Sequence, residues 1–271
     1  MNKRKQIGLV FTALLLFCGI FLFVHNKKKQ VHDLPSILNS NRLSVLIDSS
    51  CVGFSKNGDK VVGFQYEIVK AFADTLGLEL VVSQQNDFRN CITGIKKGDY
   101  DIVASFIPNT TEIQKELLLT HPFFISKQVL VQRLIKDKDQ MPAIAPINKH
   151  LLLAKDTIFI PSHSPFKSRL EHLSNEIADT IFLIELKNKS QEQMVQMVAN
   201  GALKYTICDE KLARILCLKY PNIDISLPIG FSHTLCWGVS LQSVQLLEEL
   251  NAFLKGFIGS SDYWEIYRKY Y

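Results

Sequence analysis

Short polar stretches that directly follow predicted strands are the residues of this sequence best suited to chemistry. Asp209 comes after one apolar run, and Ser162-His163-Ser164 comes after another. A carboxylate can pair with an ammonium group, while hydroxyls and backbone N–H groups at a helix start can bind an anion. The same residue types also cap helices, so each position has a structural explanation beside the functional one. Weaker candidates follow the first predicted strand: Ser49, Ser50 and Phe54, of which Phe54 suits the core equally well.

Alternating strand-like and helix-like segments must position these side chains. Apolar runs predict strands over 43–48, 78–82 and 101–105, and apolar spacings of three and four predict helices over 63–77 and 88–97. Such alternation is typical of parallel sheets with right-handed crossovers, in which ligands bind beyond the carboxyl ends of the strands. A second series of the same kind is predicted, with strands over 157–160, 180–186 and 204–208 and helices over 165–177, 191–199 and 210–220.

Several motifs carry a family resemblance. Gly63-Phe64-x-Tyr66-Glu67, Gly98-Asp99-Tyr100-Asp101 and Thr110-Thr111-Glu112, followed by Thr120-His121-Pro122-Phe123, resemble the first lobe of the family 3 periplasmic solute-binding proteins. Ile47–Ser50, Phe64–Glu67 and Tyr205–Asp209 most resemble the amino-terminal module of the membrane-bound lytic transglycosylases F. The resemblance covers residues 42–271 and implies a periplasmic-binding-protein-like α/β fold. It implies two lobes, 42–130 with 236–271 and 131–235, joined by a hinge of two strands.

The resemblance also assigns roles to single residues. Asp209 stands where family members place the acid that takes the ligand's amino group, and Ser162–Ser164 stands where they carry a Gly-Thr/Ser-Thr/Ser loop. Thr110 begins the segment that reads Thr-Pro-Glu-Arg in amino-acid binders. The arginine of that segment binds the ligand carboxylate, and here the position is Ile113. We therefore expect a ligand other than a standard free α-amino acid; a peptide, a cell-wall fragment and no ligand at all stay open.

The charge of the chain is concentrated at its amino terminus. The formal net charge is +5, but residues 1–30 hold six of the 31 Lys and Arg residues and no acid. The remainder is close to neutral, so the composition does not indicate nucleic-acid binding. No Cys or His spacing is typical of a metal site, and we expect no metal or cofactor. Among the six cysteines, a Cys51–Cys91 bridge and buried free thiols are both compatible with the sequence.

The amino terminus has the length of a membrane span. Residues 7–24 carry no charge, and 18 residues of helix at about 1.5 Å each cover roughly 27 Å. A cleaved signal peptide and a lipoprotein modified at Cys18 are the alternatives, but the apolar run lacks a small-residue cleavage site and continues past Cys18. We expect an uncleaved anchor over 1–30 and a linker over 31–41. The resemblance places the rest in the periplasm, on a single-pass protein of the inner membrane.

The sequence thus predicts a membrane-tethered solute-binding protein that closes on a small molecule or short peptide, with an ABC transporter permease as the expected partner. A sensor of peptidoglycan-derived peptides is the alternative. An enzyme of the dehydratase type, with Glu67, Asp209 and His163 as acid/base groups, is a third reading that the spacing does not require. We expect no catalysis, because the lytic domain of the transglycosylases does not follow within the sequence.

Overall fold

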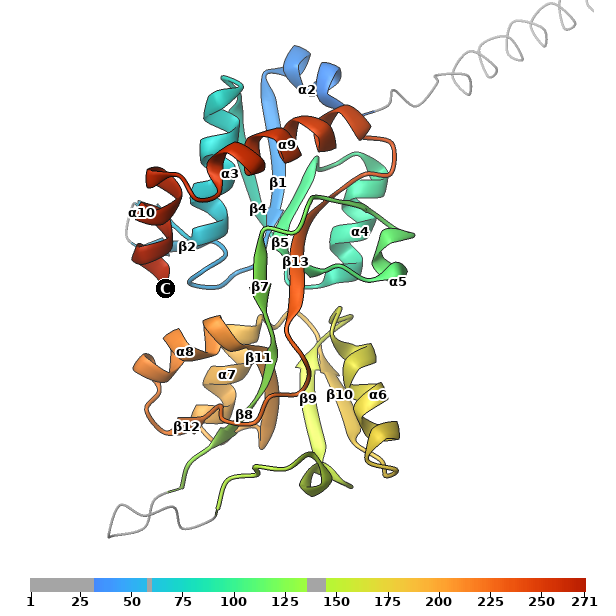
Figure 1. The fold of residues 1–271 in the computed structure, drawn as a ribbon, viewed down its shortest axis with the longest axis vertical. Helices are drawn as coiled ribbons and strands as arrows, with labels where there is room; N and C mark the ends of the chain where they lie inside the picture. The colour runs from blue at the N-terminus through green and yellow to red at the C-terminus, as the bar shows by residue number, and fades with distance from the viewer. Residues whose placement is uncertain (1–31, 58–59, 136–144) are drawn as a thin grey trace, which may run out of the picture. The chain divides into compact units, whose positions relative to one another are not determined.

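The computed structural model describes residues 32–57, 60–135 and 145–271. Residues 33–271 form one compact unit, which contains two lobes, each built on its own sheet (Figure 1). The predicted anchor over residues 1–30 lies outside the described residues. Within the described part, no helix is both long and apolar enough to cross a bilayer.

The first lobe is built on a six-stranded sheet in which three strands run parallel. β1 pairs with β4 on one side and with β5 on the other, so that Val45 lies beside both Val82 and Ile102. The return strand β13 runs antiparallel to β5. The order is β4-β1-β5-β13-β6, with β7 also paired to β13. The bounds are β1 Arg42–Ile47, β4 Glu79–Gln84, β5 Ile102–Pro108, β6 Leu118–Leu119, β7 Phe124–Ser126 and β13 His233–Val239.

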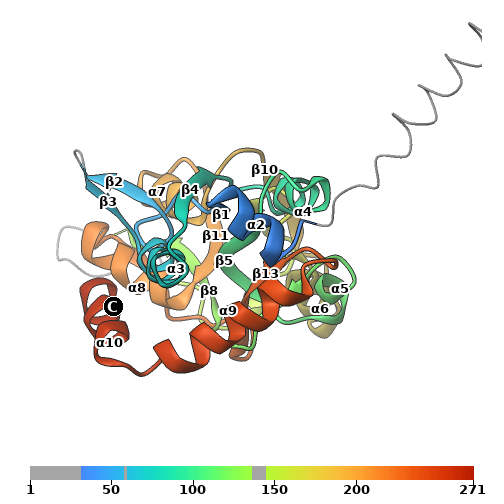
Figure 2. The ribbon, with the colours of Figure 1, turned by 90° about the horizontal axis from the view of Figure 1, so that it is seen from above.

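Helices cover both faces of this sheet, because the central strands are apolar on both sides. Val45 and Ile102 face one core cluster, and Leu46 and Val103 face the other. Figure 2 shows α3 and α9 on one side of the sheet and α4 on the other. The helices of this lobe are α2 Leu34–Ser40, α3 Phe64–Thr75, α4 Phe88–Lys97, α5 Thr111–Gln114, α9 Val244–Phe257 and α10 Ser261–Tyr270; a small hairpin of β2 Ser55–Asn57 and β3 Lys60–Val62 precedes α3.

The second lobe repeats the strand–helix construction on a five-stranded sheet. β11 runs parallel to β9 and antiparallel to β8, and the order is β10-β9-β11-β8-β12. The predicted helix over 191–199 is found with the same bounds, and the others shift by at most two residues at either end. The elements are β8 Gln128–Arg133, η1 His150–Leu153, β9 Thr157–Pro161, α6 Lys167–Glu176, β10 Phe182–Leu186, α7 Gln191–Ala199, β11 Tyr205–Asp209, α8 Glu210–Lys219 and β12 Ile223–Asp224.

Two extended crossings connect the lobes. Lys127 alone separates β7 of the first sheet from β8 of the second. The return crossing enters the first sheet at His233, which pairs with Ser126. The boundaries therefore lie a few residues earlier than the predicted 130/131 and 235/236, because β8 pairs with β11 from Gln128 onward and β13 pairs with β7 from His233 onward.

The segment predicted as a linker over 31–41 contains a helix of the first lobe. Asp33 caps α2, and Ile37 on this helix is fully buried. The Asp33 carboxylate also accepts hydrogen bonds from the backbone N–H groups of Gln245 (3.1 Å) and Leu246 (2.8 Å), at the start of α9. Sequence patterns did not indicate this, because both contacts join residues more than 200 positions apart.

Candidate functional site

A cavity of about 100 Å³ lies between the two lobes, where the parallel strands of both sheets end. The first lobe lines it with Asp48 after β1, Phe88 of α4 and Ser105 and Phe106 of β5. The second lobe lines it with Ser164 after β9, Lys189 before α7, and Asp209 at the end of β11. This is the position that parallel sheets offer for ligands. Because ligand pockets for larger molecules measure roughly 300–1,000 Å³, the cavity suits a small ligand group.

Asp209 has the helix-capping role that the sequence allowed, and it also lines the cavity. Its Oδ1 accepts hydrogen bonds from the backbone N–H groups of Lys211 (3.0 Å) and Leu212 (3.3 Å), which caps α8. Its Oδ2 is buried and has no hydrogen-bond partner among the described residues. Burial raises the pKa of Asp209, and the nearby Ser126 hydroxyl and the α8 backbone N–H groups only partly offset that effect. One carboxylate oxygen thus holds the helix, and the other is buried without a hydrogen-bond partner among the described residues.

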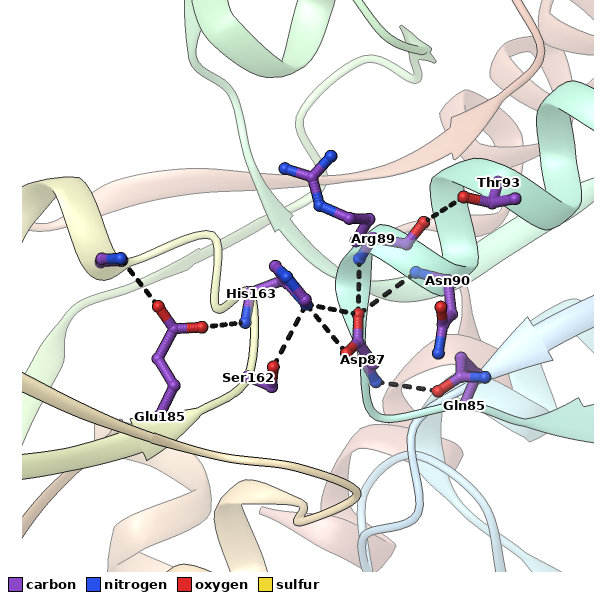
Figure 3. Close-up of polar contacts among 9 residues, drawn as sticks. Gln85, Asp87, Arg89, Asn90, Thr93, Ser162, His163 and Glu185 are labelled. Carbon is purple, nitrogen blue, oxygen red and sulfur yellow. Dashed lines mark hydrogen bonds and ion pairs between the residues drawn. The ribbon is translucent and has the colours of Figure 1, made fainter.

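The loop Ser162–Ser164 brings one of its three side chains to the cavity. Ser164 lines it, and the Ser164 Oγ also accepts a hydrogen bond from the backbone N–H of Phe166 (3.3 Å) at the start of α6. Ser162 is buried but does not line the cavity. His163 has a left-handed backbone (φ 53°), and its side chain points toward Asp87 (Figure 3).

His163 forms a contact between the lobes that sequence reasoning missed. Its Nδ1 lies 2.9 Å from the Oδ2 of Asp87 (Figure 3). A carboxylate only accepts, so this nitrogen carries the proton. The Oδ1 of Asp87 in turn caps α4 by accepting from the backbone N–H groups of Arg89 and Asn90. An aspartate just before a predicted helix signalled the cap, but no local pattern could indicate its partner 76 residues away.

The weaker candidates after the first strand support the cavity wall without lining it. Ser49 donates from its N–H and its Oγ to the Oδ1 of Asn86 (2.9 and 3.0 Å), which ties this loop to the turn before α4. Ser50 donates to the Oδ2 of Asp48 (2.6 Å), a cavity residue. Phe54 packs edge-on against Tyr66, with ring centroids 5.5 Å apart. The residue near these candidates that lines the cavity is Asp48. Burial raises the pKa of Asp48, and hydrogen bonds from Ser50 and Ser105 lower it in part.

Thr110 and Ile113 lie on a second hollow, which we call the outer groove. This groove of about 610 Å³ runs between α4, α5 and α6 and shares Phe88, Ser164 and Pro165 with the cavity. Thr110 caps α5 through its Oγ1, which accepts from the Ile113 N–H at 3.5 Å. Ile113 is 7% exposed and packs in the apolar cluster of α4 and β5. The position of the usual carboxylate-binding arginine is thus part of a hydrophobic core.

Two further contacts join the lobes around the cavity. The Cys51 N–H donates to the Oε2 of Glu192 (2.8 Å). In the second contact, the Lys211 ammonium of α8 donates to the Tyr267 hydroxyl (2.8 Å) and lies over three rings of the first lobe, 4.8 Å from Phe124, 5.3 Å from Tyr267 and 5.6 Å from Tyr271. Cation–π contacts of this kind contribute most when the cation is desolvated.

The cysteines of the described part are free thiols, so the Cys51–Cys91 bridge is not formed. Burial raises the pKa of Cys91 to about 12, and burial together with Glu192 raises that of Cys51 to about 12. A thiol of such high pKa carries almost no thiolate at neutral pH and is a poor nucleophile. The described residues also contain no group of three His, Cys, Asp or Glu side chains arranged to hold a metal.

Comparison with known proteins identifies the family. The family model of the bacterial extracellular solute-binding proteins, family 3, matches residues 43–271. Among curated proteins, the membrane-bound lytic murein transglycosylase F of Desulfosudis oleivorans is 24% identical over 269 residues, which is 99% of this chain and 56% of that protein. The one from Pseudomonas fluorescens is 22% identical and is covered to 48%. The chain therefore spans about half the length of these relatives.

Solved structures confirm the predicted two-lobed fold. An ancestral arginine-binding protein bound to arginine superposes with a TM-score of 0.72 at 21% identity, covering 85% of this chain and 98% of that protein. The solute receptor for L-cysteine of Neisseria gonorrhoeae gives a TM-score of 0.73 at 16% identity, covering 87% and 92%. At such low identity the likeness shows the fold only and does not indicate which ligand this chain binds.

Proposed function

Since the chain belongs to the family 3 bacterial extracellular solute-binding proteins, we propose that it is a membrane-tethered module that closes on a small solute bearing an ammonium group. Residues 7–24 would be the tether in the inner membrane, and the two lobes would lie in the periplasm. Closure would follow from contacts that the solute makes with both lobes at once, since a ligand shifts a conformational equilibrium only through such differential contacts.

The observation that carries this proposal is the unpartnered Oδ2 of Asp209. A buried carboxylate oxygen without a hydrogen bond is costly for the folded protein, and a ligand ammonium would supply a charge-assisted bond. The cavity beside it is walled by Phe88 and Phe106, which suits the carbon skeleton of a small solute. The apolar Ile113 offers nothing to an anion on the lobe where amino-acid binders carry their arginine.

Two roles are compatible with such binding. Delivery to an ABC-type permease is favoured by the solved neighbours, one of which is an amino acid ABC transporter substrate-binding protein of Streptococcus pneumoniae bound to L-arginine. A sensor of peptidoglycan-derived peptides is favoured by the curated relatives, which are lytic murein transglycosylases. We propose binding without turnover, because Glu67 is engaged by Lys269 and Tyr270 of α10 and does not line the cavity.

Thermal unfolding of the full chain in mild detergent tests this function. The panel contains amino acids, short peptides and muropeptides, each paired with its N-acetylated form, which lacks the ammonium group. A ligand at about one hundred times its Kd adds about 2.7 kcal/mol of stability. We expect a raised midpoint with the free amines and none with the acetylated partners.

The pattern of binding separates the two roles. A shift with free amino acids supports uptake, and a shift confined to muropeptides supports the sensor. Equal shifts with acetylated and free compounds, or none at all, would show that no ammonium-binding site exists.

A further inference from the structure

The charged residues that line the cavity are unequally distributed between the lobes. The described lining contains two acids, Asp48 and Asp209, and a single cation, Lys189. Lys189 belongs to the second lobe, in the turn between β10 and α7. Its side chain is half-buried, and its ammonium has no ion pair or hydrogen bond within 32–57, 60–135 and 145–271.

The other cations near the cavity, Lys211 among them, do not line it. Lys96 and Lys167 line the outer groove and form ion pairs with Glu116 and Glu185. Arg89 also lines that groove and does not line the cavity. Lys189 is thus the one cavity cation whose charge no described protein group balances.

The local structure around Lys189 also favours an anion. Lys189 directly precedes Ser190, the N-cap of α7, and both Ser190 and Gln191 line the cavity. The amino end of a helix carries partial positive charge, which adds to that of a neighbouring ammonium. The capping box of Ser190 and Gln193 holds this helix start in place, so the turn that bears Lys189 is well defined.

We infer that Lys189 binds the carboxylate of the solute whose ammonium is bound by Asp209, in place of the arginine that position 113 lacks. This inference rests on the proposed function and narrows its ligand to small solutes that carry both an ammonium and a carboxylate group. Both charged contacts then come from the second lobe. The first lobe covers the bound solute with Phe88 and Phe106. The distance between the ammonium and the carboxylate of the ligand then matches the distance between Asp209 and Lys189, and need not be the distance found in an α-amino acid.

Calorimetric titration of the full chain with matched pairs of compounds tests this assignment. The series comprises glycine, β-alanine, 4-aminobutyrate, 5-aminopentanoate and the dipeptide Ala-Ala, each paired with its carboxamide. A charge-assisted hydrogen bond to an ammonium is lost in the carboxamide. We expect the wild-type chain to bind at least one carboxylate about tenfold or more tightly than its amide, and the preferred chain length reports the spacing of the two sites.

Three variants make the result specific to Lys189. Lys189→Met should bring the acid and the amide to within about twofold of each other, and Lys189→Arg should retain the preference. Lys187→Met, which removes an exposed lysine of the same turn, should leave the preference unchanged. Thermal unfolding of each variant checks that the fold is kept.

The outcomes separate this inference from the function on which it rests. Wild-type chain that binds amines but does not distinguish acids from amides would overturn the role of Lys189 and leave the proposed function standing. The same holds if Lys189→Met keeps the preference. Wild-type chain that binds no compound bearing an ammonium group would overturn both.

Discussion

The two walls of the cavity are built alike but carry different groups. Each wall consists of the carboxyl ends of parallel strands and the starts of helices. The second lobe presents an acid with a free oxygen, Asp209, and an unpaired cation, Lys189. The first lobe presents the rings of Phe88 and Phe106, and its acid, Asp48, already accepts a hydrogen bond from Ser50. On the proposed assignment, one lobe recognises the charges of the ligand and the other encloses it.

The largest expected effect comes from neutralising the acid of the second lobe. Asp209→Asn keeps a good N-cap for α8 but removes the charge that an ammonium would pair with. Truncating one partner of a buried charged pair costs about 2–5 kcal/mol, so affinity for amines should fall by about thirtyfold or more in a calorimetric titration. Asp48→Asn is the matched change on the first lobe and should weaken binding far less. Equal losses in the two variants would contradict the division between the walls.

The next effect concerns stability on the first lobe. Ile113 is buried in an apolar cluster, so Ile113→Ala should lower the free energy of unfolding by about 2–4 kcal/mol, measured by urea denaturation. The preference among ligands should not change. Ile125→Ala, at a side chain that is 62% exposed, should stay within about 0.5 kcal/mol of the wild type. A changed ligand preference in Ile113→Ala would mean that the first lobe also takes part in recognition.

The smallest expected effect is on the pH dependence of stability. Burial raises the pKa of Asp209 above its ordinary value of 3.8 in the folded chain. The folded state therefore binds this proton more tightly than the unfolded state does, and the ligand-free chain should lose stability as pH rises through the window between the two pKa values. In Asp209→Asn this loss should be smaller, as thermal unfolding between about pH 3.5 and 7 would show. An identical pH profile in the variant would contradict a buried, unpartnered carboxylate.

Much of the fold follows from local patterns. The alternation of apolar runs and helical spacings predicted the parallel strands of both sheets. Gly98 ends α4 because, without a Cβ, it adopts a left-handed backbone (φ 75°), and Asp87 begins α4 because its carboxylate caps the helix. The absence of a carboxylate-binding side chain at position 113 follows from the residue type alone, since Ile113 is apolar. The capping role of Asp209 was also foreseeable, since an aspartate between a strand and a helix is a favoured N-cap.

Contacts between distant segments required the folded chain. The sequence could not show that His163 meets Asp87, that Lys211 lies among Phe124, Tyr267 and Tyr271, or that Lys189 lines the cavity. Nor could it show that Ser49, Ser50 and Thr110 stabilise loops and a helix start without lining the cavity. A hydroxyl satisfies either role equally well, and the choice depends on which groups the packing of the two lobes brings within hydrogen-bond distance. Residue type and spacing determine the strands and helices and the polar residues at their ends. The packing of the two lobes against each other determines which of those polar residues line the cavity.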